Sequence, residues 1–226
     1  MAYILNIETS STVCSVSVAK NGELLAFKEL NNGFTHAENL HVFIEEVLIE
    51  SSLNINQLNA IAISKGPGSY TGLRIGVSAA KGFAFGLNIP LIALNTLQIM
   101  TFGAMALFVG EEVIYCPMID ARRMEVYTSI YNHKLEQLTK TEALIVDEKS
   151  IIQFDNYDKI YFFGDGMPKC KTLLKEIENA HFIENILPSA KNMSLLSFSK
   201  FKENQFEDVA YFEPFYLKDF LILSKK

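Results

Sequence analysis

The chain opens with short blocks of apolar residues rather than with helical spacing. Residues 2–10 (AYILNIETS) form a nearly continuous apolar run, which predicts a buried strand. Residues 12–20 (TVCSVSVAK) alternate apolar and small polar side chains, as in a half-exposed strand. Asn21-Gly22 then precedes residues 23–29 (ELLAFKE) and is typical of a two-residue hairpin turn. Three strands able to pair antiparallel are therefore expected first.

A helical pattern follows these strands. Thr35 and Glu38 have the spacing of a capping box, which predicts the start of a helix. Its expected buried face repeats at i, i+3, i+4, i+7 and i+8 and consists of Leu40, Phe43, Ile44, Val47 and Leu48. Further segments predict a buried strand at 60–64, a helix at 72–86, a strand at 89–95 and a helix at 96–108. The element order of this half is βββαβαβα.

The second half repeats this order. Strands are expected at 113–119, 124–131 and 142–146, a helix at 147–154, a strand at 159–163, a helix after Pro168, a strand at 181–183 and a helix at 190–202. We therefore predict an α/β protein of two lobes, 1–108 and 109–226, each with a mixed sheet in βββαβα order flanked by helices. The last helix is expected to pack back on the first lobe. A cleft between two lobes is where small ligands usually bind.

Composition narrows the function classes. The formal net charge of -6 and the pI near 5.3 argue against a surface that binds nucleic acid unaided. Any role in RNA chemistry would need a partner that supplies positive charge. The three cysteines, Cys14, Cys116 and Cys170, are too widely spaced for a metal or redox motif, so reduced buried thiols are expected. No basic leader and no apolar run of ~20 residues occurs, so we expect a cytoplasmic protein without a membrane anchor.

The glycine-rich segment 66–72 (GPGSYTG) resembles a phosphate-binding loop but lacks its chemistry. Leu73 and Arg74 stand where a Walker A loop would have lysine and a hydroxyl residue, and Thr71 occupies the third glycine position of G-x-G-x-x-G. Independent nucleotide hydrolysis by this loop is therefore not expected. His36 and His41, five residues apart, point about 140° from each other on a helix and cannot share a metal ion. They are interpreted as solvated or core-edge side chains, and no metal site is predicted.

The helix after this loop has little polar surface. Between residues 72 and 86 its only charged side chains are Arg74 and Lys81. Four small residues on it are spaced by four: Gly72, Gly76, Ala80 and Ala84. Such a row lets another element approach closely. The covering element is either the chain's own sheet and first helix or a helix of a partner protein, and the pattern leaves both open.

Longer motifs carry a resemblance to a known family. Residues 66–86 (GPGSYTGLRIGVSAAKGFAFG), preceded by ILNIETS and followed by MIDARRMEVYTSIY, GDG and FEPFYLKDF, resemble the TsaB (YeaZ) family over nearly the whole chain. The resemblance implies an actin-like (ribonuclease H-like) ATPase fold, which agrees with the doubled element order. It also implies a non-catalytic subunit of the machinery for tRNA threonylcarbamoyladenosine. Its partner TsaD transfers threonylcarbamoyl to N6 of adenosine 37 in tRNAs that read ANN codons.

The resemblance further implies how the subunits meet. TsaB and TsaD pair through their first helices, the ATPase TsaE binds the pair, and TsaB alone forms a homodimer through the same surface, so tRNA is contacted only through the complex. Mapped onto this chain, the expected partner interface comprises His36, Leu40, Phe43, Val47, Leu73, Arg74, Val77, Ala80, Lys81 and Ala84. Val77→Arg is then expected to abolish pairing while the monomer stays folded. The transferase carries two histidines in an H-x-x-x-H pattern. In this chain Leu40 stands four residues after His36 and Ala37 stands four residues before His41, so neither histidine has a partner at that spacing.

A remnant of the nucleotide site is also implied. Family members usually have Asp-Thr-Ser in the first strand, and this chain has Glu8, Thr9 and Ser10. Together with the turn Gly164, Asp165 and Gly166 these residues are expected to retain weak binding of ATP or ADP with magnesium, although no cofactor is required.

Two alternatives remain beside the subunit role. One is an autonomous actin-fold ATPase or kinase, or a glycoprotease-like metallopeptidase, although no activated nucleophile with an oriented base is evident. The other is direct capture of tRNA by Arg122 and Arg123. Because these arginines follow Asp120, an internal salt bridge or a clamp between the lobes is favoured for them.

Overall fold

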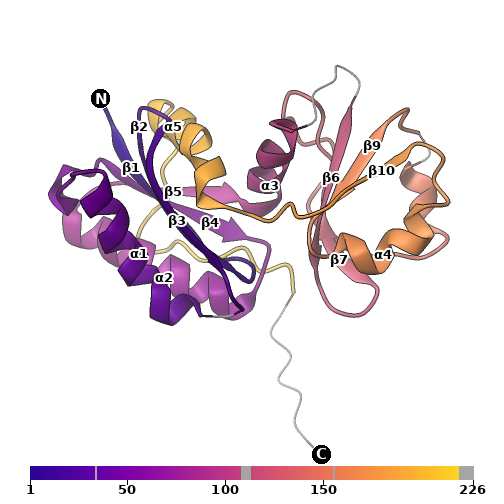
Figure 1. The fold of residues 1–226 in the computed structure, drawn as a ribbon, viewed down its shortest axis with the longest axis horizontal. Helices are drawn as coiled ribbons and strands as arrows, with labels where there is room; N and C mark the ends of the chain where they lie inside the picture. Colours follow the sequence, from indigo (N-terminus) through magenta and orange to yellow (C-terminus); the bar gives the residue numbers. More distant parts are fainter. Residues whose placement is uncertain (34, 108–112, 155, 219–226) are drawn as a thin grey trace, which may run out of the picture.

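The computed structural model describes residues 1–33, 35–107, 113–154 and 156–218, and it contains two five-stranded sheets that lie side by side (Figure 1). The strands of the first sheet are β1 (Tyr3–Glu8), β2 (Val13–Lys20), β3 (Glu23–Asn31), β4 (Ala60–Gly66) and β5 (Leu91–Asn95). Their order is β3-β2-β1-β4-β5. The first three strands pair antiparallel, and β4 and β5 run parallel to β1.

The second sheet has the same topology. Its strands are β6 (Ile114–Asp120), β7 (Glu125–Thr128), β8 (Glu142–Ile145), β9 (Ile160–Phe163) and β10 (Ala180–Ile183). In the order β8-β7-β6-β9-β10 they repeat the antiparallel and parallel pairings of the first sheet, strand for strand. The predicted α/β class with a doubled mixed sheet is therefore confirmed.

Helices cover both faces of the first sheet and fill the space between the sheets. The long helices are α1 (His36–Glu50), α2 (Tyr70–Leu87), α3 (Thr96–Met105), α4 (Met167–Leu174) and α5 (Ser194–Lys202), and the short 3-10 helices are η1 (Ile55–Gln57), η2 (Ser150–Phe154) and η3 (Ala190–Met193). In Figure 1, α1 and α2 lie on one face of the first sheet, α5 lies on the other, and α3 stands between the two sheets. Leu97, Met100 and Ala104 of α3 join Tyr115 and Phe163 of the second sheet in one apolar cluster.

Strand β2 is buried on both faces, whereas the sequence predicted a half-exposed strand. Ser15 and Ser17, the small polar positions of the alternation, are as buried as the apolar positions between them. The Ser17 hydroxyl donates to the Ala190 carbonyl at 2.8 Å, and the Ser15 hydroxyl accepts from the Ala190 amide at 2.7 Å. The late segment η3 therefore covers the face that the alternation had assigned to solvent, and its backbone satisfies these hydroxyl groups.

Two local predictions fail. Thr35 makes no side-chain capping bond and its buried hydroxyl has no hydrogen-bond partner among the described atoms, so the predicted capping box does not form. The helix predicted at 147–154 shortens to the 3-10 helix η2, whose preceding turn is closed by backbone amides bonded to the Asp147 carboxylate. The predicted end of the third helix at 108 and the lobe boundary between 108 and 109 lie outside the described residues, and this boundary stays a prediction.

Two chain-wide features complete the fold. Cys14, Cys116 and Cys170 are buried free thiols. Over the parts of the chain that the structure covers, no helix combines the length and the apolar character that crossing a bilayer requires.

Candidate partner interface and inter-lobe cleft

The glycine-rich loop packs directly on the turn that follows β1. A side chain at Gly68 would overlap the backbone of Ser10, and one at Gly72 would overlap the carbonyl oxygen of Thr9. Ser69 ends the loop and caps α2 by accepting from the Gly72 amide at 3.3 Å. The glycines therefore allow two backbone segments of the same chain to approach each other, and the room that a phosphate would need is occupied.

Three of the six residues expected to bind nucleotide are buried inside the first lobe. Glu8, Thr9 and Ser10 are each 0% exposed. The Thr9 hydroxyl donates to the Gly72 carbonyl at 2.8 Å, and one Glu8 carboxylate oxygen accepts from the Ser10 amide at 2.6 Å. In this arrangement their side chains are not accessible to a ligand, because the loop that precedes α2 covers them.

The carboxyl group of Glu8 has an unusual environment. Desolvation by burial raises the pKa of Glu8 above its ordinary value of 4.5, although hydrogen bonds from Ser10 and Ser64 oppose this shift. Its second carboxylate oxygen has no hydrogen-bond partner among the described atoms. The charged carboxylate is costly to bury at this position, which is the physical cause of the upward pKa shift.

The second expected nucleotide segment, Gly164 to Gly166, supports the second sheet. The Gly166 amide donates to the Met118 carbonyl at 3.0 Å, and the Asp165 carboxylate accepts from the Asp120 amide at 3.0 Å. Both bonds hold the end of β6. Among the described residues, no hydrogen bond connects this turn to Glu8, Thr9 or Ser10, and a nucleotide site made by both segments stays a prediction.

The small-residue row on α2 faces inward, so of the two coverings that the sequence left open, the chain's own sheet and first helix is the one observed. Gly72 contacts Thr9 and His36, Gly76 contacts Thr9 and Ile63, and Ala80 and Ala84 belong to the core cluster of the first lobe. The chain's own first sheet and α1 therefore occupy the space along this row.

Most of the expected partner interface is consequently core. The buried members are His36, Leu40, Val47, Leu73, Val77, Ala80 and Ala84, and Phe43 packs partly buried against the same cluster. Val77 is 4% exposed, so Val77→Arg would place a charge in the core and is not a test of a surface. The prediction identified the buried sides of both helices in place of their outer sides.

Open surface on α2 lies on the opposite side of the helix. Ser78, Gly82 and Gly86 are exposed and also spaced by four, and a side chain placed at Gly82 or Gly86 would meet no described atom within 4 Å. Beside them Phe85 is 82% exposed. On α1, Val42 and Ile49 are exposed apolar side chains as well. We call these residues (Val42, Ile49, Ser78, Gly82, Phe85 and Gly86) the outer helix face.

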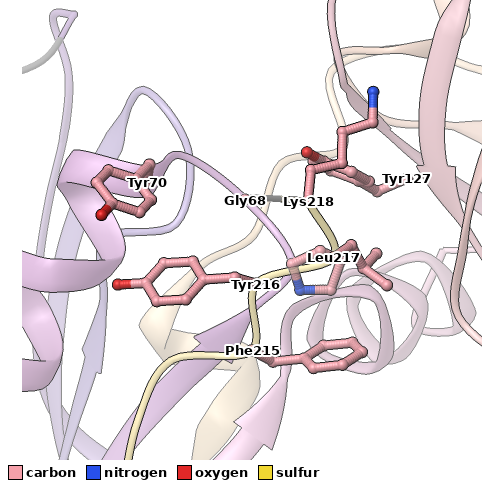
Figure 2. Close-up of a pocket in the computed structure, with 8 residues that line it drawn as sticks. Gly68, Tyr70, Tyr127, Phe215, Tyr216, Leu217 and Lys218 are labelled. Carbon is pink, nitrogen blue, oxygen red and sulfur yellow. The ribbon is translucent and has the colours of Figure 1, made fainter. Parts of the chain in front are cut away.

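The remaining charged members of the expected interface bind the chain's own C-terminal segment, residues 206–218. Lys81 donates to the carbonyls of Ala210 and Phe212 at 3.2 and 2.8 Å. Arg74 stacks over the Tyr70 ring at 4.2 Å and donates to the Tyr216 hydroxyl at 3.3 Å. Figure 2 shows Tyr216 beside Tyr70, and their ring centroids are 4.9 Å apart. Part of this segment, residues 212–218, lies in the family motif FEPFYLKDF, but the sequence did not predict its contacts, because the segment has neither helical nor strand periodicity.

The C-terminal segment also crosses between the lobes. Phe215 donates its amide to the Lys65 carbonyl at 2.7 Å in the first lobe, and the Lys218 ammonium pairs with the Glu125 carboxylate in the second. Figure 2 shows Leu217 and Lys218 continuing from Tyr216 toward Tyr127. The narrow pocket lined by this segment and the loop before α2 has a volume of about 40 Å³, which is far below that of usual ligand sites.

The structure corrects the prediction for one of the two histidines. His36 is 1% exposed and its Nε2 lies 2.8 Å from the Ser11 carbonyl oxygen, so it is a core side chain, whereas His41 is exposed and packs near Phe83. The described residues include no group of three or more potential metal ligands.

Arg122 and Arg123 are exposed in a turn with positive φ, and it is Lys169 that pairs with Asp120. Neither arginine takes part in an ion pair among the described residues, so the predicted internal salt bridge is not found, whereas a clamp between the lobes and direct capture of tRNA stay predictions.

Comparisons with known proteins agree on one family. The family model described as TsaD, tRNA N6-adenosine threonylcarbamoyltransferase, matches residues 33–220. The "tRNA threonylcarbamoyladenosine biosynthesis protein TsaB" of Haemophilus influenzae is 30% identical over 226 residues, which cover 96% of this chain and 93% of that protein. The structure of YeaZ from Pseudomonas aeruginosa superimposes with a TM-score of 0.83 and 26% identity over 96% of this chain and 100% of that one.

A more distant structure shows the breadth of the fold. The activator of the 2-hydroxyisocaproyl-CoA dehydratase from Clostridium difficile, solved with bound ADPNP, superimposes with a TM-score of 0.50 at 10% identity over 90% of this chain and 96% of that one. This likeness concerns the fold alone. With the doubled sheet topology it confirms the predicted actin-like architecture.

Proposed function

Since the chain belongs to the TsaB family of tRNA threonylcarbamoyladenosine biosynthesis proteins, we propose that it is an accessory subunit that binds a TsaD-like transferase. The transferase would form N6-threonylcarbamoyladenosine at position 37 of tRNAs that read ANN codons. A TsaE-like ATPase would bind the assembled pair, and tRNA would be contacted through the complex. The protein would act in the cytoplasm and require no cofactor of its own.

The observation that carries this proposal is the contrast between the buried turn after β1 and the open outer helix face. Glu8, Thr9 and Ser10 are fully buried beneath the loop before α2, which supports the proposal that another subunit carries out the corresponding chemistry. The outer helix face, in contrast, combines exposed apolar side chains with two glycines that no described atom covers. Glycines let the backbone of another helix approach closely, and the exposed apolar side chains beside them would be buried by that helix.

The match to the transferase family model supports the choice of occupant. The matched residues 33–220 contain both α1 and α2, so a TsaD-like chain would carry the same helix pair. Two similar helix pairs can pack against each other in a nearly symmetric way. The same geometry would allow a homodimer when the transferase is absent. A stable interface of this kind would bury more than ~1,000 Å² in total.

Two substitutions on the outer helix face test the pairing. Gly82→Arg fills the stripe, and Phe85→Asp replaces an 82% exposed apolar side chain with a charge. We expect each to weaken binding of the transferase from the same organism by at least ~30-fold, as loss of a central interface residue does. Isothermal titration would measure the dissociation constant without added nucleotide, and sedimentation of the chain alone would report the homodimer.

A matched control lies in the second lobe. Ile152 is 62% exposed and distant in sequence from both helices, so Ile152→Asp introduces the same charge on an unrelated surface and should leave binding unchanged. Circular dichroism melting would establish that all three variants fold. Wild-type affinity in both Gly82→Arg and Phe85→Asp would refute the outer helix face as the interface. Turnover of ATP by the isolated chain would favour the autonomous enzyme instead.

A further inference from the structure

A broad hollow that opens to solvent, here called the cavity, lies between the lobes, apart from the buried Glu8 to Ser10 turn. It has a volume of about 370 Å³, within the range of sites for small molecules. Its lining residues are Lys65, Asn95, Gln137, Lys140, Thr141 and Phe215. The neighbouring pocket beside Tyr216 is about 40 Å³, so this cavity has the room for a ligand that the other lacks.

The cavity occupies a favourable place in the topology. Lys65 and Asn95 stand at the carboxyl ends of β4 and β5, which run parallel to each other. Ligands of α/β sheets usually bind outside the carboxyl ends of parallel strands. Asn95 also caps α3, because its side chain accepts from the Leu97 amide at 2.8 Å. The positive end of a ten-residue helix therefore begins at the cavity.

Its opposite wall comes from the second lobe and is held in place by hydrogen bonds. The Gln137 Nε2 atom lies 2.9 Å from Ser129 Oγ, 2.8 Å from the Thr139 carbonyl oxygen and 3.1 Å from Thr141 Oγ1, and its two hydrogens are shared among these three acceptors. The Asn95 amide group donates to Thr141 Oγ1 at 3.4 Å across the lobes. Since Thr141 Oγ1 already accepts these two bonds, its own hydrogen remains able to donate to a ligand.

The charge of the lining is one-sided. The lining contains two lysines and no aspartate or glutamate, although the whole chain has a net charge of -6. Neither Lys65 nor Lys140 takes part in the ion pairs found among the described residues. Lys200 donates to the Ala93 carbonyl at 2.9 Å, and its charge is repelled by Lys65 and attracted by Glu207 and Glu203. Two ammonium groups without carboxylate partners favour an anion between them.

We propose that this cavity binds a small organic anion whose phosphate or carboxylate group lies between Lys65 and Lys140. Thr141 donates its hydroxyl hydrogen to the same group, and the Phe215 side chain contacts the ligand's apolar part. Because Phe215 belongs to the C-terminal segment and the other walls come from both lobes, the bound anion links three parts of the chain. This site is independent of the transferase interface on the outer helix face.

Isothermal titration with two anions and a neutral analogue tests the site. Glycerol 3-phosphate represents phosphate esters, succinate represents carboxylates, and glycerol is the uncharged control, all at constant ionic strength. We expect saturable binding of at least one anion and none of glycerol. Lys65→Gln and Lys140→Gln should each weaken that binding by at least ~10-fold, since each removes a charge-assisted hydrogen bond. Competition by inorganic phosphate or by acetate would identify the recognised group.

Lys134→Gln is the matched control. Lys134 is exposed on the same lobe but does not line the cavity, so its loss changes the net charge equally and should leave the dissociation constant unchanged. Lys140 is exposed, so Lys140→Gln tests the site without risk to folding even if Lys65→Gln is unstable. The proposal is overturned if neither anion binds saturably at millimolar concentration. It is equally overturned if Lys140→Gln binds as tightly as the unaltered protein.

Discussion

At the scale of single residues, two glycines on α2 have different surroundings. Gly72 lies against the carbonyl oxygen of Thr9, and Gly82 faces open space. We expect Gly72→Ala to lower the free energy of unfolding by ~1–3 kcal/mol, because the added methyl group must displace backbone in a packed core. Gly82→Ala should raise it by ~0.5–1 kcal/mol through helix propensity alone. Urea unfolding of the two variants beside the unaltered chain gives both values.

The pair is its own control, since both changes add one methyl group to one helix. Equal effects of the two substitutions, in either direction, would mean that the turn after β1 does not rest on α2 as described. A loss confined to Gly72→Ala would support the close approach.

Glu8 gives a prediction about pH. Burial raises the pKa of its carboxyl group above 4.5 in the folded state, so the folded protein holds this proton more tightly than the unfolded chain does. This contribution to stability is complete below pH 4.5 and is lost as the pH rises from 4.5 to the folded-state pKa. The glutamine side chain in Glu8→Gln cannot ionise, so this variant does not lose stability in that pH window. We therefore expect the unfolding free energy of the unaltered chain to decrease relative to that of Glu8→Gln as pH rises through this window.

Chemical denaturation at a series of pH values, with both proteins in the same buffers, measures the difference. Subtraction cancels the titration of every other carboxylate that both proteins share. A difference independent of pH would show that Glu8 ionises normally in the folded chain.

At the scale of elements, α2 explains why a mostly apolar helix need not be an interface on every side. Its inner side lies on the first sheet, Phe83 contacts His41 of α1, and Lys81 and Arg74 reach the C-terminal segment. Three neighbours within one chain thus account for most of the apolar circumference. What remains for a partner is the outer helix face alone, and the substitutions Gly82→Arg and Phe85→Asp follow from this distinction.

The whole molecule depends on segments that pass from one lobe to the other. Helix α3 shares an apolar cluster with β6 and β9, and the C-terminal segment bonds to Lys65 in one lobe and to Glu125 in the other. A chain that ends at Glu213 loses Tyr216 and Lys218, whereas one that ends at Lys218 keeps both. We expect only the shorter chain to show faster amide exchange around Tyr70 and Glu125, because only it loses the contacts between the lobes.

Hydrogen-exchange mass spectrometry on both truncated chains makes this comparison. Interior strands such as β1 and β9 should keep their protection in both, since their burial does not involve the segment. Identical exchange in the two chains would mean that residues 214–218 do not restrain the lobes.

Sequence alone determined the order of strands and helices, the doubled mixed sheet and the family, because periodicity and motifs are local properties of the chain. It also identified which residues of α2 share a face, since a spacing of four places Gly72, Gly76, Ala80 and Ala84 in one row on any helix. Capping at Thr35 and the length of η2 were missed, because hydrogen bonds at helix ends depend on neighbouring geometry.

Only the tertiary structure decided what each face meets. Periodicity cannot distinguish a row covered by the chain's own sheet from one covered by a partner, because both bury the same small residues. Residues far apart in sequence meet where Ala190 covers β2, where Tyr216 contacts Arg74, and where Lys65 and Lys140 line one cavity. Such contacts arise from chain topology and packing, to which no local pattern of side chains corresponds.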